Sequence, residues 1–176
     1  MGNAVQIQGG ALAGCAAALA ARREGVPVVV YEKSHFPRHK VCGEFLSSGA
    51  EALLRDFGLW DRFARLNPAP ITRLELHFRN KSFHYQLPDP CWGLSRYTLD
   101  HWLMQAAIES GADWRHEAAP ARTLPVILAH GRRERAPKGD RVFGFKAHHA
   151  GPSSGAIELH FFDRCYVGIS AVENGI

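Results

Sequence analysis

The 176-residue sequence contains no apolar run long enough to cross a bilayer. The alanine-rich stretch near its start also lacks the positively charged segment that opens a signal peptide. Its four cysteines are widely separated and form no C-x-x-C pair, which favours a reducing compartment over a disulfide framework or a zinc site. We therefore expect a cytoplasmic protein with no transmembrane segment.

The sequence also lacks a concentrated charge of one sign. Its formal net charge is +4, and the lysines and arginines are scattered with no basic stripe interleaved by aromatics, so we expect no nucleic-acid partner. Ten histidines are many for this length. His148, His149 and His160 could meet on adjacent strands, but their spacing matches no recognised metal site, and we expect no bound metal.

The segment that carries most information is VQIQGGALAGCAAALAARREGVPVVVYEK, from Val5 to Lys33. It predicts a strand, a glycine turn, a helix that ends near Gly25, and a second strand at 28–31 that ends in an acid. This order is typical of proteins that hold a dinucleotide pyrophosphate at the N-terminus of the helix. An alternative is a strand–helix–strand unit whose glycines serve packing alone.

Within the turn GGALAG, Gly9 would form the tight bend and Gly14 would let the helix pack on the strand. Ala11 stands where the fingerprint has its second glycine, so a methyl group would project toward the ligand. Glu32 lies close to the spacing expected of an acid that binds a ribose hydroxyl. Its charge would repel a 2′-phosphate, which favours FAD or NAD over NADP.

The rest of the chain predicts a mixture of helices and strands. Pro88-Asp89-Pro90 should break a strand, Thr98 should cap a helix, and 132–140 should form a charged linker. The final strands should form a β-meander. We expect helices at 47–55, 59–66 and 98–110, and strands at 71–78, 82–87, 114–117, 123–129, 141–149, 157–162 and 165–170.

Three motifs in this order resemble the FAD-dependent oxidoreductases of the geranylgeranyl reductase and aromatic-hydroxylase superfamily, which includes flavin monooxygenases and halogenases. They are GGALAG with the strand end VYEK, the loop FPRHKVCGE, and the helix LSRYTLDHWLMQAAIESGA. The resemblance covers residues 5 to 117. It implies an α/β fold in which a Rossmann-like FAD-binding domain (1–135, with an inserted hairpin at about 70–90) is interleaved with part of a β-sheet substrate domain (136–176).

The resemblance also implies the cofactor, FAD, and the residues that would contact it. The pyrophosphate would lie against the glycine turn and the adenosine ribose against Glu32. The adenine and phosphate side would lie against the cations Lys33 and Arg38. Cys42 and Gly43 would lie near the isoalloxazine, and Arg96 would reach the cofactor from its helix. The full set is Gly9, Gly10, Ala11, Ala13, Gly14, Glu32, Lys33, Arg38, Cys42, Gly43 and Arg96.

The sequence departs from the family pattern after Glu117, where only about ten residues precede Leu128, and it has Ala129-His130-Gly131 where the family has an Ala-Asp-Gly turn. The chain therefore resembles an N-terminal portion or a shortened form. We expect an FAD-dependent reductase or monooxygenase acting on an apolar or aromatic small molecule, with NAD(P)H as a candidate electron donor and the catalytic residues unassigned. The alternatives are a non-catalytic remnant that binds nucleotide weakly or not at all, and a small NAD-dependent dehydrogenase.

Overall fold

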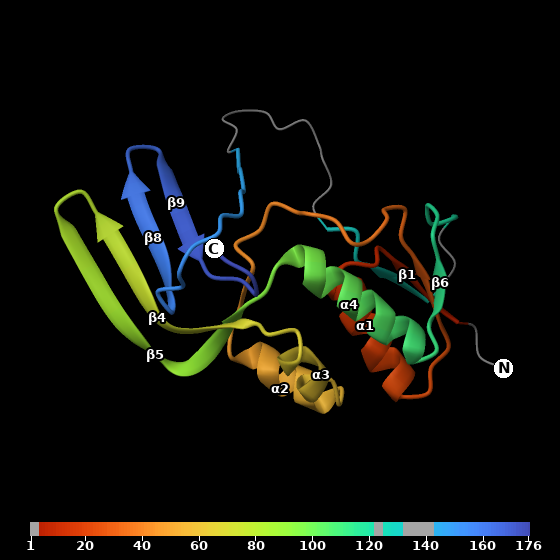
Figure 1. Ribbon diagram of the computed structural model, residues 1–176. Helices are drawn as coiled ribbons and strands as arrows, with labels where there is room; N and C mark the ends of the chain where they lie inside the picture. The colour runs from red at the N-terminus through yellow and green to blue at the C-terminus, as the bar shows by residue number, and fades with distance from the viewer. Residues whose placement is uncertain (1–3, 122–124, 132–142) are drawn as a thin grey trace. The chain divides into compact units, whose positions relative to one another are not determined.

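The computed structural model describes residues 4–121, 125–131 and 143–176. The chain divides into two compact units: Met1–His39 with Tyr97–Phe143, and Lys40–Arg96 with Gly144–Ile176. Each unit contains its own sheet (Figure 1). These units differ from the ranges 1–135 and 136–176, because the segment 40–96 groups with the C-terminal residues. The roles of those ranges as cofactor and substrate domains stay predictions.

The first unit is a parallel sheet flanked by helices, as the sequence predicts. Its strands are β1 (Val5–Gln8), β2 (Val28–Tyr31), β6 (Asp113–Arg115) and β7 (Val126–Leu128), in the order β6-β2-β1-β7. Helix α1 (Leu12–Arg23) connects β1 to β2, and α4 (Arg96–Glu109) precedes β6. The core of this unit joins strand residues to small residues of the helices and of the connection after α4: Ile7, Val28, Val30, Ala18, Ala107 and Ala112. Alanine on the helix side lets the helix backbones lie close to the strands.

The second unit is a five-stranded mixed sheet with two short helices. Strands β4 (Ala69–Phe78) and β5 (Lys81–Gly93) form the expected hairpin, and β8 (Ala156–Phe162) with β9 (Cys165–Ser170) forms another. The hairpins join through a parallel pairing of β4 with β8, and β3 (Phe45–Leu46) extends the sheet beyond β5. Helices α2 (Gly49–Asp56) and α3 (Trp60–Ala64) lie between β3 and β4 in the sequence.

Three sequence-based expectations about elements are wrong: the strand break at 88–90, the helix cap at Thr98 and the first strand of the final β-meander. Pro88 and Pro90 do not end β5, because the register shifts between Ile71 and Arg73 and leaves the residues around both prolines unpaired with β4. Prolines are tolerated there because a bulge needs no ladder N–H. Thr98 lies inside α4, which begins at Arg96.

The β-meander expected at the end of the chain lacks its first strand. Residues 143–149 belong to no strand, although His149 exchanges two backbone hydrogen bonds with Ile176. The start of that expected strand, the linker 132–140 and the first part of the strand 123–129 lie outside the described residues. Among the described helices, none has the length and apolar character needed to span a membrane.

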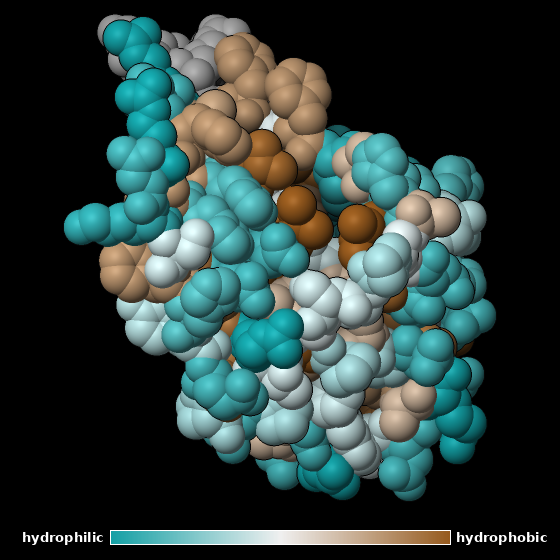
Figure 2. All heavy atoms as spheres, turned by 60° about the vertical axis from the view of Figure 1, so that its left-hand side comes forward, coloured by the Kyte–Doolittle hydropathy of each residue, from teal (hydrophilic) through white to brown (hydrophobic). Residues whose placement is uncertain are grey.

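The mixed sheet has one polar and one apolar face, since side chains alternate along each strand. Stacked rings of Phe78 and Phe161, 4.9 Å apart, and the neighbouring Phe83 and Tyr166 mark the apolar face. Phe78, Phe83 and Tyr166 are 45%, 43% and 65% exposed, so rings of this face remain in contact with solvent. Figure 2 shows that brown, apolar side chains reach the molecular surface among mostly polar ones.

Candidate functional site

The glycine turn after β1 is held by main-chain contacts that only glycine permits. Gly9 has a φ of +104°, and its N–H donates to the Tyr31 carbonyl oxygen at 2.8 Å. A Cβ at Gly9 would lie 2.6 Å from the Ala129 carbonyl oxygen. Both the positive φ and this close approach exclude a larger residue. The bend that the sequence assigned to Gly9 therefore has a direct geometric cause.

Two further glycines allow close packing around the same turn. A Cβ on Gly14 would lie 1.8 Å from the Gly9 carbonyl oxygen, so α1 packs directly on the turn. A Cβ on Gly10 would lie 2.2 Å from the ring of Trp114 on β6. The packing role expected of Gly14 is present. The proximity of Trp114 to Gly10 was not foreseen from the sequence.

The N-terminus of α1 presents main-chain donors without a side-chain cap. Ala11 occupies the N-cap position, makes no side-chain cap hydrogen bond, and is followed by no acidic residue in the first turn. The first bond of the helix runs from the Cys15 N–H to the Ala11 carbonyl at 2.9 Å. The N–H groups that precede Cys15 in the helix thus have no partner within it, and the helix dipole makes this end positive.

Glu32, directly after β2, is the acid that faces this turn. Its side chain is buried, with 8% of the residue exposed. One carboxylate oxygen accepts a hydrogen bond from the Gly10 N–H at 2.9 Å, and the other accepts from the Ser34 N–H at 2.7 Å. The acid and the glycine turn, 22 residues apart, thus meet as the sequence predicts.

The cations expected near the adenine and phosphates, Lys33 and Arg38, are both exposed and lie in the loop after β2. The Arg38 guanidinium lies 5.8 Å from the ring centre of Phe36 in the same loop. Ala13, in the first turn of α1, is exposed as well.

The remaining predicted residues, Cys42, Gly43 and Arg96, belong to the second unit. Gly43 has open space where a Cβ would stand, so the chain does not require glycine there for its own packing. The Cys42 sulfur accepts a hydrogen bond from the Glu44 N–H at 3.4 Å. The Arg96 N–H donates to the Glu44 carboxylate at 2.5 Å, which gives α4 an acidic partner at its first residue.

Glu44 was not among the residues singled out from the sequence, although it directly follows the Cys-Gly pair. It is 4% exposed, has a φ of +55°, and accepts from Lys146 at 2.7 Å and His148 at 2.6 Å. Burial alone would raise the pKa of this carboxyl. The hydrogen bonds from Lys146, His148 and the Arg96 N–H, with the charge of Lys146, outweigh it and hold the pKa below 4.5. Glu44 thus remains ionised inside the second unit at neutral pH.

The histidines that the sequence grouped as possible ligands do not meet. His148 contacts Glu44, and His149 pairs through its backbone with Ile176. His160 lies on β8 beside His77 of β4. The strand register, which the sequence does not reveal, decides this pairing.

Known proteins similar to this chain are flavin enzymes, and no family model matches it. A 1H-pyrrole-2-carbonyl-[peptidyl-carrier protein] brominase from Pseudoalteromonas luteoviolacea (strain 2ta16) is 28% identical over 113 residues, which are 63% of this chain and 28% of that protein. The structure of the flavin-dependent brominase Bmp2 is 25% identical, with a TM-score of 0.58, over 64% of this chain and 28% of that one.

A third similar protein is the myxobacterial chondrochloren halogenase CndH, whose structure matches 97% of this chain and 50% of its own with a TM-score of 0.77. Its sequence identity is 18%, so this match concerns the fold alone. The chain spans 28% of the length of the brominase relative. This chain is similar to the FAD-dependent halogenases and monooxygenases, as its three motifs predict. The similarity in sequence covers about 64% of the chain, and the fold is similar as well.

Proposed function

We propose that this chain holds FAD, as part of a flavin-dependent oxidoreductase, with the pyrophosphate at the N-terminus of α1. The observation that supports this most directly is the meeting of Glu32 with the Gly10 N–H next to uncapped helix donors. Main-chain N–H groups and the positive helix end suit a diphosphate, and a buried carboxylate suits a ribose hydroxyl. The same carboxylate disfavours a 2′-phosphate.

Each predicted residue then has a role that its chemistry allows. Gly9, Gly10, Ala11, Ala13 and Gly14 line the pyrophosphate with main-chain atoms. Glu32 binds the adenosine ribose, while Lys33 and Arg38 face the adenine and phosphate side. We further propose that Cys42 and Gly43 lie near the isoalloxazine, where the open space at the Gly43 Cβ position suits a flat ring. Arg96 supplies a fixed cation.

Bound FAD would supply the redox chemistry, while this chain binds and orients the cofactor. The proposed reaction is the reduction or oxygenation of an apolar or aromatic small molecule, with NAD(P)H as electron donor. The relatives described above are halogenases and monooxygenases, so the geranylgeranyl reductase branch stays a prediction. The chain spans a minor part of its curated relative, and the activity of a whole enzyme is part of this proposal.

One observation favours the alternative of a non-catalytic remnant. A Cβ at Gly9, Gly10 or Gly14 would lie 2.6, 2.2 or 1.8 Å from another atom of the chain, so packing is sufficient to account for these glycines. A substitution such as Gly9→Val would therefore damage the fold as well as the proposed site. A decisive test must change the charge at the helix end without disturbing the turn.

Ala13→Glu meets this requirement, because Ala13 is exposed in the first turn of α1. A carboxylate there favours the helix by about 0.3–1 kcal/mol but repels a diphosphate. We expect the wild-type protein to bind FAD, measured by quenching of flavin fluorescence. We expect Ala13→Glu to weaken that binding at least about tenfold, which corresponds to about 1.4 kcal/mol, while the melting temperature without ligand is kept or rises.

Ala13→Gln is the matched control, since it has nearly the same size without the charge. Its FAD affinity should stay within about threefold of wild type. Equal affinity of the Glu and Gln variants would place the diphosphate elsewhere. If the wild-type chain binds no FAD and its melting temperature is unchanged by either FAD or NAD, the remnant is the correct description.

A further inference from the structure

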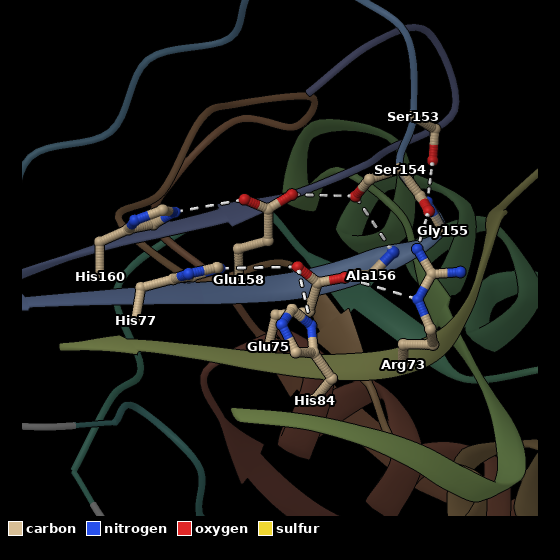
Figure 3. A network of polar contacts seen from close by, with 10 residues as sticks. All are labelled: Arg73, Glu75, His77, His84, Ser153, Ser154, Gly155, Ala156, Glu158 and His160. Carbon is tan, nitrogen blue, oxygen red and sulfur yellow. Dashed lines mark hydrogen bonds and ion pairs between the residues drawn. The ribbon is translucent and has the colours of Figure 1, made fainter. Parts of the chain in front are cut away.

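The polar face of the second sheet gathers six ionisable side chains, Arg73 among them, from three strands. The parallel register pairs Glu75 of β4 with Glu158 of β8, and His77 with His160, while the antiparallel register places His84 of β5 opposite Glu75. Figure 3 shows these side chains converging on the same side of the sheet. Two carboxylates in directly opposite positions repel each other, and Arg73 on the same face, 3.5 Å from a Glu75 oxygen, offsets one of the two charges.

Three of these residues come close enough to share one ion. One ligand atom from each of His77, Glu158 and His160 lies within 4.8 Å of the other two. The two imidazoles stack with ring centres 4.3 Å apart and planes 11° from parallel, and the His160 Nε2 lies 3.2 Å from a Glu158 oxygen. Bonds of about 2.0–2.2 Å from both imidazoles to one ion require at least one ring to rotate out of this stack, since each lone pair lies in its ring plane.

The imidazole of His77 is prepared for a ligand role. Its Nδ1 lies 3.0 Å from the Ser82 hydroxyl oxygen, which can accept the ring N–H and leave Nε2 as the atom with the lone pair. This Nε2 is buried, makes no hydrogen bond within the protein and lies 3.5 Å from a Glu75 oxygen. With its proton on Nδ1 the ring offers this nitrogen to a metal ion, and with the proton on Nε2 it faces the Glu75 carboxylate instead.

We propose that His77, Glu158 and His160 form a binding site for a divalent transition-metal ion of the zinc type. Two imidazole nitrogens and one carboxylate oxygen are ligands that Zn²⁺ accepts, and Glu75 stands beside the group as a further carboxylate. The ion would connect β4 to β8, two neighbouring strands that are far apart in the sequence. All of these residues belong to the second unit, so the site is independent of the proposed FAD turn.

The test uses the full 176-residue chain without a histidine tag, titrated with Zn²⁺ by calorimetry and with Co²⁺ by visible absorption. We expect one equivalent of each ion to bind, with the Co²⁺ spectrum showing imidazole and carboxylate ligation. His77→Ala and His160→Ala should each weaken Zn²⁺ binding more than about 100-fold, since loss of an outer-sphere partner alone costs about 10–100-fold. His116→Ala, an exposed histidine of the first unit, is the control and should change nothing.

Glu158→Gln tests the site without removing side-chain volume, should an alanine variant fail to fold. It should keep the metal-free melting temperature near that of wild type and weaken Zn²⁺ binding more than about tenfold. Saturating Zn²⁺ should also raise the melting temperature of wild type but not of Glu158→Gln. The proposal is overturned if wild type does not bind Zn²⁺, or if Glu158→Gln or His160→Ala binds it as wild type does.

Discussion

The two sheets of this chain differ in where their apolar and ionisable side chains lie. In the first, short parallel strands bury Ile7, Val28 and Val30 against the alanines of flanking helices. In the second, long strands carry ionisable groups on one face and partly exposed aromatic rings on the other. The proposed chemistry differs accordingly, because the first unit offers main-chain donors at a strand end and the second offers side chains on an open face.

This contrast indicates which contacts each unit depends on. The first depends on glycine at the turn after β1. α1 packs so closely on this turn that a Cβ at Gly14 would lie 1.8 Å from the Gly9 carbonyl oxygen. The second depends on paired charges, since Glu44 is buried among three donors. Substitutions that add one atom at a closely packed glycine should therefore damage the unit that contains it, and substitutions that remove a buried charge should damage the second unit in particular.

The largest expected effect comes from Gly14→Ala. The added Cβ would stand 1.8 Å from the Gly9 carbonyl oxygen, a main-chain atom that cannot move without opening the turn. Alanine gains about 1 kcal/mol of helix propensity, but we expect overpacking to outweigh it and lower the free energy of unfolding by about 2–3 kcal/mol. Urea unfolding measures the loss, and hydrogen exchange should place it in β1, β2 and α1.

Gly93→Ala is the counterpart in the second unit, where the Cβ would lie 1.8 Å from the Ala171 carbonyl oxygen. It should reduce amide protection in β3, β4 and β5 instead. Gly43→Ala, with open space at that position, is the control and should stay within about 0.5 kcal/mol of wild type. Identical exchange patterns for Gly14→Ala and Gly93→Ala would mean that the units unfold together and that the contrast does not extend to stability.

Glu44→Gln should have the next largest effect, because it removes a charge and leaves Lys146 and His148 without their acid. We expect the free energy of unfolding at pH 7 to fall by about 1–2 kcal/mol. The pKa of Glu44 is lowered in the folded state, so its contribution is complete well above pH 4.5 and is lost as the pH falls through the folded pKa.

The difference in stability between wild type and Glu44→Gln should therefore be constant near neutral pH and shrink below about pH 4.5. Urea unfolding at a series of pH values measures it. Glu51→Gln is the matched control, because Glu51 pairs with Arg55 at 2.7 Å on an exposed helix surface. A difference for Glu44→Gln that does not change with pH would contradict the ionised, hydrogen-bonded carboxylate.

The sequence predicts the first unit well because its signals are local. The glycine turn, the alanine-rich helix and the apolar strand 28–31 each follow from neighbouring residues, and the structure confirms β2 at Val28–Tyr31. The sequence predicts the second unit less well, because the order of the strands in that sheet depends on pairing between distant segments. The bulge around Pro88 and Pro90 and the parallel pairing of β4 with β8 come from register between distant strands.

The candidate sites divide in the same way. The contact of Glu32 with the glycine turn is predictable, since a strand–helix–strand unit brings the end of β2 beside the end of β1. The network of Glu44 with Lys146 and His148 is not, because residues 144–148 belong to no strand or helix. The cluster of His77, Glu158 and His160 is equally hidden, since no spacing in the sequence relates residue 77 to residue 160.

The smallest expected effect concerns an exposed charge pair of the first unit. If the contrast holds, this pair contributes little to the stability of that unit. Arg115 on β6 donates to Asp113 at 2.7 Å, and this hydrogen bond with the Asp113 charge raises the pKa of the guanidinium further. Both side chains are about half exposed, so water replaces the pair when it is broken. We expect Arg115→Gln to leave the urea midpoint unchanged within error. A clear loss of stability, comparable to that of Glu44→Gln, would show that charge pairing supports both sheets alike.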